Sequence, residues 1–240
     1  KRIPAEPRKI IVRKMNASKL SLIITALLLI VACTSETYTP GEGKYSMMRA
    51  DFVETRTDAS GKLYCAVTDS GDSLVLSPKR TAEWAKTPDS LYRALLYHNV
   101  TTPGTETKPL SMINVLTPTV KNKPVVKAPK TDPVIFRSAW MSRGGRYINL
   151  GLAVKTGHKD NADNRQTIGM MCDEVKTYDD GHKHYILTLL HNQNGVPEYY
   201  SANFFMSIAS YLLPILPKAG DEITININTY NGKIEKTFRY

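Results

Sequence analysis

Two histidines, His182 and His184, are separated by one residue in a run that predicts a β-strand. Side chains two positions apart on a strand point to the same face, so this pair could supply two ligands to zinc or copper. A third ligand would have to come from His158, Asp160 or Asp173. Structural zinc sites usually present four ligands at tighter spacing. We therefore expect no metal site and interpret the pair as polar residues at the end of a hairpin.

Sequence motifs for catalysis are absent. The chain contains no Gly-x-Ser-x-Gly nucleophile elbow and no glycine-rich loop that would cradle a phosphate. Acidic neighbours occur as Asp173-Glu174 and Asp221-Glu222. Adjacent side chains on a strand point to opposite faces, so neither couple can act as an acid/base pair. We predict no catalytic residue and no cofactor, and we expect that the protein is not an enzyme.

Cys33 follows an apolar run, residues 20–31, that has basic residues on its N-terminal side. The run is shorter than the roughly 20 residues that a membrane-spanning helix needs, and its order of segments is typical of a secretory signal peptide. The sequence Ile-Val-Ala-Cys at 30–33 resembles the lipobox of bacterial lipoproteins. This resemblance implies that the chain is cut before Cys33, that the thiol carries diacylglycerol, and that the new amine is acylated.

Residues 1–32 are therefore predicted to be a leader, in which Met15 would start a compact n-region. Residues 33–44 are polar, contain proline and glycine, and predict a flexible tether. Several acyl chains, at about 0.8 kcal/mol per buried methylene, make a stable membrane anchor. We expect a lipid-anchored protein of the cell envelope, in the outer membrane and facing the periplasm or the exterior. A plain secretory peptide and a buried apolar helix are the alternatives.

Residues 45–120 alternate short apolar runs with turn sequences, for example at 59–61 and 69–72. Five short strands and one helical turn at 81–86 are typical of a small Greek-key barrel. We predict an OB-like β-barrel here, and a small open sheet is the alternative.

The composition changes at residues 121–133, where prolines alternate with lysines and predict a solvated linker. Contact of these lysines with a lipid surface is the alternative. Beyond it, residues 148–155 alternate apolar and polar side chains, and Asn231-Gly232 predicts a hairpin. Short strands at this spacing predict an immunoglobulin-like β-sandwich over 134–240. The predicted fold class is therefore all-β.

Two cysteines, Cys65 and Cys172, remain if Cys33 is lipidated. Leu63, Cys65 and Val67 alternate along one predicted strand, and Cys172 ends a similar alternation in the second domain. Each cysteine should therefore face the interior of its own domain, as a small buried thiol does. A disulfide between them is the alternative, because an envelope compartment can oxidise thiols.

The net charge of +10 is concentrated in the predicted leader. Residues 1–32 hold seven basic residues and one acid, which is +6, so the rest carries 10 − 6 = +4. A charge of this size favours solubility and is too small for a phosphate-binding surface. The tyrosines of the predicted barrel lie among leucines near Arg93 instead of alternating with bases, unlike those of single-strand binders. We expect no nucleic-acid partner.

Several short sequence segments of the second domain resemble those of one family, the NigD-like lipoproteins of Bacteroides and its relatives. They are Ser138-Ala139-Trp140, the strand entry at 144–150, the turn at 191–198 and Tyr199-Tyr200. The resemblance covers essentially all of the chain after the leader. It implies an N-terminal OB-like barrel and a C-terminal β-sandwich on a lipid anchor. The family is named after a bacteriocin gene cluster, which implies a role in immunity, and it offers no catalytic residue to transfer.

Three functional hypotheses follow. The first is a non-catalytic binding or structural module that recognises an envelope protein, a peptide or a glycan and contacts the membrane through its anchor. The second is an envelope hydrolase with a site at the domain junction, which would require His158, His182, His184 or Asp173 to converge there. The third is a bacteriocin-immunity protein, which is a binding function with a defined partner.

Overall fold

The computed structural model describes residues 47–100, 106–158 and 164–240, and Met47–Tyr240 form one compact unit. The predicted leader, the tether and Cys33 lie outside the described residues, as does Asp160. Within the described ranges, no helix combines the length and the apolar character that a bilayer span requires.

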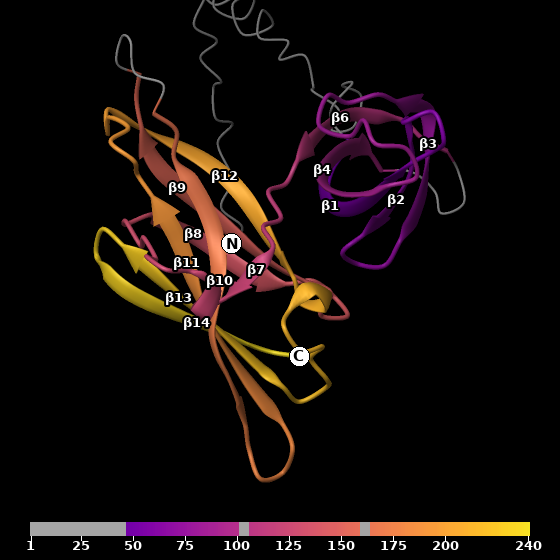
Figure 1. The fold of residues 1–240 in the computed structure, drawn as a ribbon. Coiled ribbons are helices and arrows are strands. Elements are labelled where there is room, and N and C mark those ends of the chain that lie inside the picture. Colours follow the sequence, from indigo (N-terminus) through magenta and orange to yellow (C-terminus); the bar gives the residue numbers. More distant parts are fainter. Residues whose placement is uncertain (1–46, 101–105, 159–163) are drawn as a thin grey trace, which may run out of the picture. The chain divides into compact units, whose positions relative to one another are not determined.

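The N-terminal part of the described chain is a curled sheet of six strands (Figure 1). They are β1 (Met48–Thr57), β2 (Leu63–Thr68), β3 (Ser73–Arg80), β4 (Leu91–Asn99), β5 (Glu106–Thr107) and β6 (Pro109–Asn114). Their order is β5-β3-β2-β1-β4-β6, and β5 runs parallel to β3. Only Lys108 separates β5 from β6, so the two ends of this order belong to nearly one continuous strand. This is the topology expected of an OB-like barrel, and we call these strands the barrel.

The barrel core is small and aliphatic. It contains Val53, Leu63, Ala66, Leu76, Ala85, Ala94 and Leu96. Trp84 and Tyr92 are partly buried and pack against this core. Their rings meet each other edge to face, with centroids 5.9 Å apart. The segment predicted as a helical turn at 81–86 forms a turn without helix.

A bulge at Tyr64 changes the pattern predicted for β2. Leu63 pairs with Thr57 and Cys65 with Arg56, so Tyr64 is an extra residue that shifts the inward face by one position. Leu63 and Ala66 are therefore buried, while Val67 is 41% exposed. The prediction that Leu63 and Val67 share a buried face is wrong for this reason.

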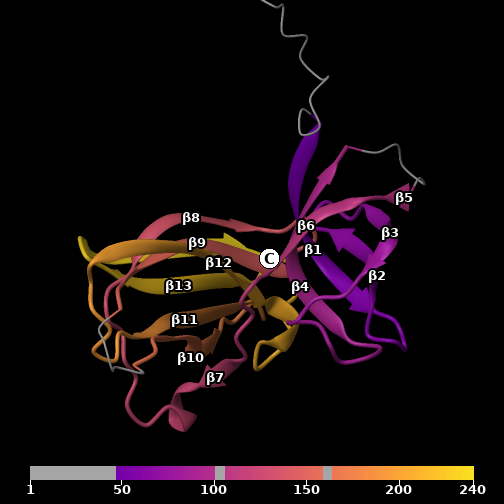
Figure 2. The same ribbon diagram turned by 90° about the horizontal axis from the view of Figure 1, so that it is seen from above.

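The C-terminal part consists of two sheets and is the β-sandwich that the sequence predicted. The five-stranded sheet has the order β14-β13-β11-β10-β7, and the three-stranded sheet has the order β12-β9-β8 (Figure 2). The strands are β7 (Val120–Asn122), β8 (Ile135–Met141), β9 (Tyr147–Thr156), β10 (Thr167–Thr177), β11 (Lys183–Asn192), β12 (Tyr200–Ala209), β13 (Glu222–Thr229) and β14 (Gly232–Arg239). Two short 3₁₀ turns, η1 (Lys123–Val125) and η2 (Ser210–Leu212), complete it.

The sandwich core lies between these sheets. Its largest fully buried side chains include Ile148, Leu150 and Leu152 of β9 and Tyr185 and Leu187 of β11. The described cysteines, Cys65 and Cys172, are both free thiols. Cys172 is buried in this core, as predicted, whereas Cys65 is only partly buried.

The segment predicted as a linker, residues 121–133, includes regular structure. β7 pairs in parallel with β10 through Val120–Asn122, and Thr131 forms a bridge with His191 of β11. Lys123 reaches to 3.7 Å from Asp173 of β10. The segment thus adds an edge strand to the sandwich, which its prolines permit because an edge needs few backbone donors.

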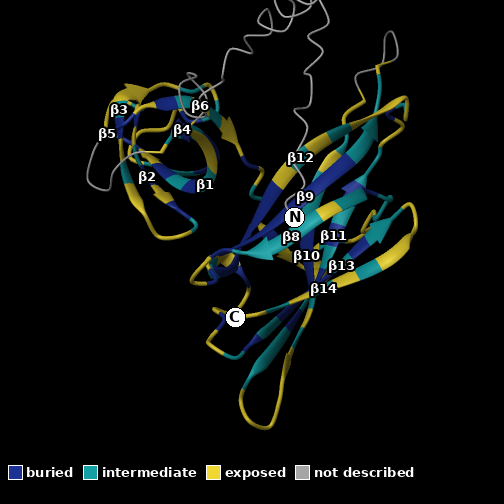
Figure 3. Ribbon diagram, turned by 180° about the vertical axis from the view of Figure 1, so that it is seen from behind, coloured by how far each residue is buried: buried dark blue, intermediate teal, exposed yellow. Residues whose placement is uncertain are grey.

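Strand β9 is buried on both faces along most of its length (Figure 3). The even-numbered residues Ile148, Leu150 and Leu152 enter the sandwich core, as their alternation predicted. The odd-numbered residues are also buried: Tyr147 is 2% exposed and Asn149 is 0% exposed. The outer face of the three-stranded sheet is therefore covered, and its contacts show that the barrel covers it.

Candidate functional site

Aromatic rings join the barrel to the outer face of the three-stranded sheet. Phe52 of β1 meets Trp140 of β8 and Phe205 of β12 edge to face, with ring centroids 5.3 and 5.2 Å apart. Gly151 of β9 makes room for this contact, because a Cβ there would come within 2.5 Å of Ser138 Oγ and 3.2 Å of the Phe205 ring. Packing at the junction thus depends on a position without a side chain.

Arg93 of β4 lies at the centre of the polar part of the junction, and its side chain is 2% exposed. Its Nη2 forms an ion pair with Asp69 at 2.7 Å and donates a hydrogen bond to Asn149 Oδ1 at 3.1 Å. Its Nε donates to Ser207 Oγ at 3.2 Å. The guanidinium also lies over the Tyr147 ring, 3.9 Å from its centroid. A buried arginine therefore joins β4 to two strands of the sandwich.

A second polar group lies beside Arg93. Glu54 of β1 accepts hydrogen bonds from Arg146 Nε and, at 2.6 Å, from the Tyr147 hydroxyl, which is 3.1 Å from the Tyr211 hydroxyl. Burial, together with the hydrogen bond to Glu54, raises the pKa of Tyr147 far above its ordinary value. Tyr147 therefore stays neutral and acts as a hydrogen-bond donor at physiological pH.

The polar groups of this junction hold the barrel and the sandwich together and show no arrangement for catalysis. Ser207 Oγ donates to Asn149 Oδ1 at 2.6 Å, and an amide oxygen is not a base that could activate a serine nucleophile. None of His158, His182, His184 and Asp173 contributes to the contacts described above. The junction therefore does not bring together the residues that the hydrolase hypothesis requires.

The two histidines singled out in the sequence have separate partners. His182 Nδ1 contacts the Asp180 carboxylate, and the His182 ring stacks on Tyr178. His184 Nε2 lies 2.7 Å from Thr224 Oγ1. Asp173 accepts a hydrogen bond from Thr188. Within the part of the chain that the structure describes, no group of three His, Cys, Asp or Glu side chains is placed to hold a metal ion.

An apolar pocket of about 700 Å³ opens at the junction. The barrel contributes Leu95, Tyr97 and Ile113, and the sandwich contributes Phe204, Phe205 and Arg137; Val115 and Leu116 line it between them. Three of these large apolar side chains remain in contact with water: Ile113 is 50% exposed, Phe205 40% and Leu116 39%. Exposed apolar surface of this kind, with a few polar groups at its rim, is typical of a binding site. We call this cavity the junction pocket.

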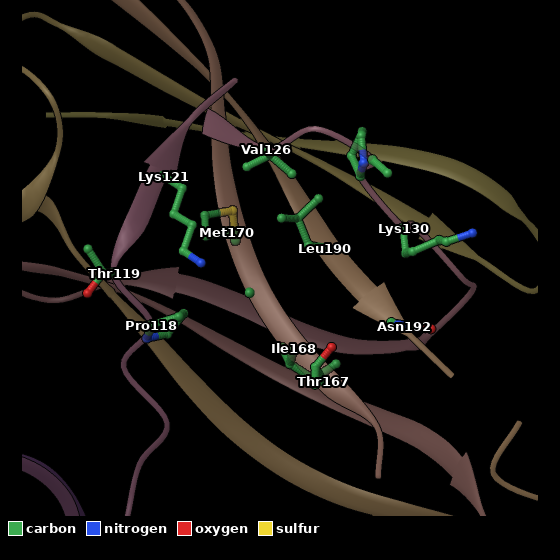
Figure 4. Close-up of a pocket in the computed structure, with 13 residues that line it drawn as sticks. Pro118, Thr119, Lys121, Val126, Lys130, Thr167, Ile168, Met170, Leu190 and Asn192 are labelled. Carbon is green, nitrogen blue, oxygen red and sulfur yellow. The ribbon is translucent and has the colours of Figure 1, made fainter. Parts of the chain in front are cut away.

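A second cavity, of about 560 Å³, lies between residues 118–130 and strands β10 and β11 (Figure 4). Gly169 and Leu190 are among the residues that line it, and Lys121 extends into it from β7. Lys130 points away from it in the same view. The charged residues of this second cavity, Lys121 and Lys130, are exposed, so water can solvate them without a ligand. The junction pocket leaves apolar surface in water, and we therefore take it as the candidate functional site.

The C-terminal sandwich also has a recognisable sequence. Residues 117–240 match the family described as the NigD-like C-terminal β-sandwich domain. The chain belongs to the NigD-like family. The match begins just before β7, so the family domain includes the edge strand that we predicted as part of a linker.

Solved structures share the fold of this NigD-like chain over 80% of its length. A NigD-like immunity protein from Bacteroides caccae is 22% identical, has a TM-score of 0.60 and is covered over 96% of its chain. A protein from Parabacteroides distasonis described as toxin-related is 19% identical, with a TM-score of 0.61 and 93% coverage of that chain. A lipoprotein candidate from Bacteroides fragilis is 16% identical, with a TM-score of 0.51 and 96% coverage. No curated protein sequence matches the chain.

Sequence reasoning missed most of the junction residues. Arg93 gave a usable signal, because it is the one charged residue in the apolar run 91–97. Asn149 gave none, since a polar residue in an alternating strand normally faces water. Glu54 and Asp69 are ordinary surface residues in the sequence, and only the contact between the two domains explains their roles.

Proposed function

We propose that this NigD-like protein is a lipid-anchored binding module of the cell envelope, and that its partner is another envelope protein that inserts apolar side chains into the junction pocket. The proposal combines two independent arguments, one for the membrane anchor and one for the binding role. The anchor rests on the lipobox-like sequence at Cys33, and the lipoprotein description of a structural neighbour is in keeping with it. The binding role rests on the junction pocket.

The lining of the junction pocket carries the binding role. Ile113, Leu116 and Phe205 leave apolar surface in water, and covering such surface contributes about 25 cal/mol per Å². The other lining side chains are mostly apolar, and those that can form hydrogen bonds belong to Tyr97, Asn114, Arg137, Ser138 and Asn203. A glycan would need many such groups to replace its bonds to water, whereas an apolar side chain of a protein needs none. The pocket chemistry therefore favours a polypeptide partner.

An immunity role gives this partner a class to test first. One structural neighbour is named a NigD-like immunity protein, and another is described as toxin-related. An immunity role that worked by binding a toxin would need a recognition surface and no catalytic group. The junction pocket could supply this recognition surface, because it leaves apolar side chains exposed between the two domains. We propose a bacteriocin-type polypeptide as the first partner to test.

The decisive experiment is site-specific photo-crosslinking in the envelope of cells that produce the full chain. A photoreactive amino acid at Ile113, inside the pocket, should capture a single envelope or toxin polypeptide. The same amino acid at Val75 of β3 is the matched control, because Val75 is 59% exposed in the barrel but does not line the pocket. Mass spectrometry then identifies the captured chain.

A charge variant completes the test. Ile113→Glu places a carboxylate in the pocket at a half-exposed position, so folding should be preserved while capture falls at least tenfold. Val75→Glu should leave capture unchanged. Equal crosslinking from both positions, or no effect of Ile113→Glu, would show that the junction pocket is not the binding site.

A further inference from the structure

Strand β12 has an unpaired edge next to the junction pocket. It is the edge strand of the three-stranded sheet, and its other side pairs with β9 in continuous register from Tyr200↔Thr156 to Ala209↔Tyr147. On the free side, Leu116 forms a parallel bridge with Met206 and accepts a hydrogen bond from Ser207 N–H at 2.8 Å. In the part of the chain that the structure describes, no strand pairs with this side between Tyr200 and Phe205.

The bond at Ser207 fixes the direction of the unpaired groups. Backbone N–H and C=O groups alternate between the two sides of a strand with a period of two, and the β12–β9 register contains no bulge. Because Ser207 N–H points to the free side, those of Ser201, Asn203 and Phe205 must point there too. All three residues are exposed. They present a row of donors and acceptors that match the backbone of one further strand.

Other sheet edges in the sandwich are protected against such pairing. Strand β14 carries Lys233, Glu235, Lys236 and Arg239, β7 has only three residues, and β8 has a bulge at Arg137. Charges, short length and bulges are the usual devices that prevent edge pairing. Strand β12 has ten residues with no charge and no proline. It is the edge in the described sandwich that lacks all of these devices.

Cavities lie on both sides of this edge. The junction pocket contains Asn203 and Phe205, whose cross-strand partners Ala153 and Gly151 place them on the outer face of the sheet. A cavity of about 370 Å³ is lined by Ala202, on the opposite face, and Phe204 lines both cavities. Alternate side chains of a strand point to opposite faces. A strand added beside β12 would therefore place successive side chains in one cavity and then the other.

The charge of the junction pocket adds a further requirement. Arg137 lines this pocket and is exposed, and no carboxylate of the described residues lies within ion-pair distance of it. None of the residues that line the pocket is acidic. A ligand with an Asp or Glu among its apolar side chains would complement this charge.

We infer that the partner supplies an extended polypeptide segment that pairs with the free edge of β12 from Ser201 to Phe205. The segment alternates apolar side chains between the two flanking cavities and carries an acidic residue that reaches Arg137. This mode of recognition is β-strand addition, in which main-chain hydrogen bonds provide affinity and alternate pockets provide specificity. The inference deepens the proposed function and rests on it, because it names the form in which the partner reaches the junction pocket.

The test begins with a displayed library of random octapeptides, selected on the full chain in detergent. The peptides recovered should alternate apolar residues and include an acid, and one of them, made synthetically, becomes the probe. Asn203→Pro removes an N–H that points to the free side and should weaken probe binding at least tenfold. Proline is tolerated on an edge where its nitrogen faces solvent, so the sheet should survive. Asn203→Ala is the matched control, because it removes the same side chain but keeps the N–H. Asn203→Pro should therefore bind the probe at least tenfold more weakly than Asn203→Ala.

Hydrogen exchange on the unmodified protein gives a second readout that no variant can confound. Probe binding should slow amide exchange at Ser201, Asn203 and Phe205. Equal binding of Asn203→Pro and Asn203→Ala, or unchanged exchange at these amides, overturns the inference. If Ile113→Glu then still weakens binding, the pocket proposal stands alone. An empty selection also overturns the inference, and so does a dimer of the free protein that Asn203→Pro dissociates, since β12 would then pair with a second copy.

Discussion

The guanidinium of Arg93 lies 3.9 Å from the centre of the Tyr147 ring, and the two residues belong to the barrel and the sandwich respectively. The same guanidinium pairs with Asp69, within the barrel, and donates to Asn149 across the junction. A cation that is desolvated in this way is stable only if the groups around it stay in place. Arg93 therefore joins β4 to β9, and both strands contribute residues that line the junction pocket.

We predict that Arg93→Met destabilises the protein by about 3 kcal/mol, because it removes the ion pair with Asp69 and the buried donor to Asn149 and Ser207. Asp69 loses its ion pair with Nη2 in this variant and keeps the hydrogen bond from Asn149 Nδ2. Urea unfolding followed by tryptophan fluorescence measures the loss. Arg56→Met on β1 is the control, because Arg56 is exposed, and it should change stability by less than about 0.5 kcal/mol. Equal effects of the two variants would show that the contacts of Arg93 do not stabilise the junction.

Alkaline pH should destabilise the junction through Tyr147. Burial and the bond to Glu54 raise the pKa of Tyr147 above its ordinary value of about 10. Above that pH the unfolded chain loses the phenolic proton while the folded chain keeps it. The unfolded state then binds fewer protons, so the free energy of unfolding falls as pH rises. Stability is fully present below pH ~10 and declines above it.

The variant Tyr147→Phe isolates this contribution. It should be less stable than the parent at pH 7, because Glu54 loses a donor. Its stability should then fall less steeply between pH 9 and pH 11, as measured by thermal midpoints at each pH. A residual slope should remain, since burial also raises the pKa of Tyr185 to about 12. Parallel curves for the two proteins would show that Tyr147 does not titrate as described.

Two strand glycines should respond in opposite directions to alanine. At Gly151 a Cβ would meet Ser138 Oγ at 2.5 Å, so Gly151→Ala should cost about 1–3 kcal/mol through overpacking. At Gly169 the nearest atom to a Cβ is 3.8 Å away, and alanine there should be neutral or stabilising by up to about 1 kcal/mol. Calorimetric midpoints for both variants check the contrast. Destabilisation by Gly169→Ala as large as by Gly151→Ala would contradict it.

The all-β fold, the barrel and the sandwich could be predicted from the sequence, because alternation and turn residues are local signals. The hairpin at Asn231-Gly232 and the core face of β9 are confirmed examples. The bulge at Tyr64 could not be predicted, since an extra residue changes the phase of a strand without a diagnostic residue type. The phase error then placed Val67 inside when it is exposed.

The candidate site was harder to predict than the fold. Asn149 and Glu54 lie far apart in the sequence, and each looks like a solvated strand position. They become part of a site only because the barrel covers the outer face of β9, which is a contact between domains. A single sequence contains no periodic signal for such a contact. Arg93 is the exception, because a lone arginine in a leucine-rich strand implies a buried partner.

The anchor can be tested apart from the site. Cells that produce the full chain and are fed an alkyne fatty acid should incorporate the label into it, because Cys33 is predicted to carry acyl chains. Cys33→Ser should abolish labelling and move the protein from the membrane pellet to the soluble fraction, since acyl burial provides the attachment. Cys65→Ser is the matched control, because Cys65 is a partly buried free thiol, and it should keep both label and membrane attachment. Labelling that persists in Cys33→Ser would assign the lipid to another position and remove the basis of the anchor.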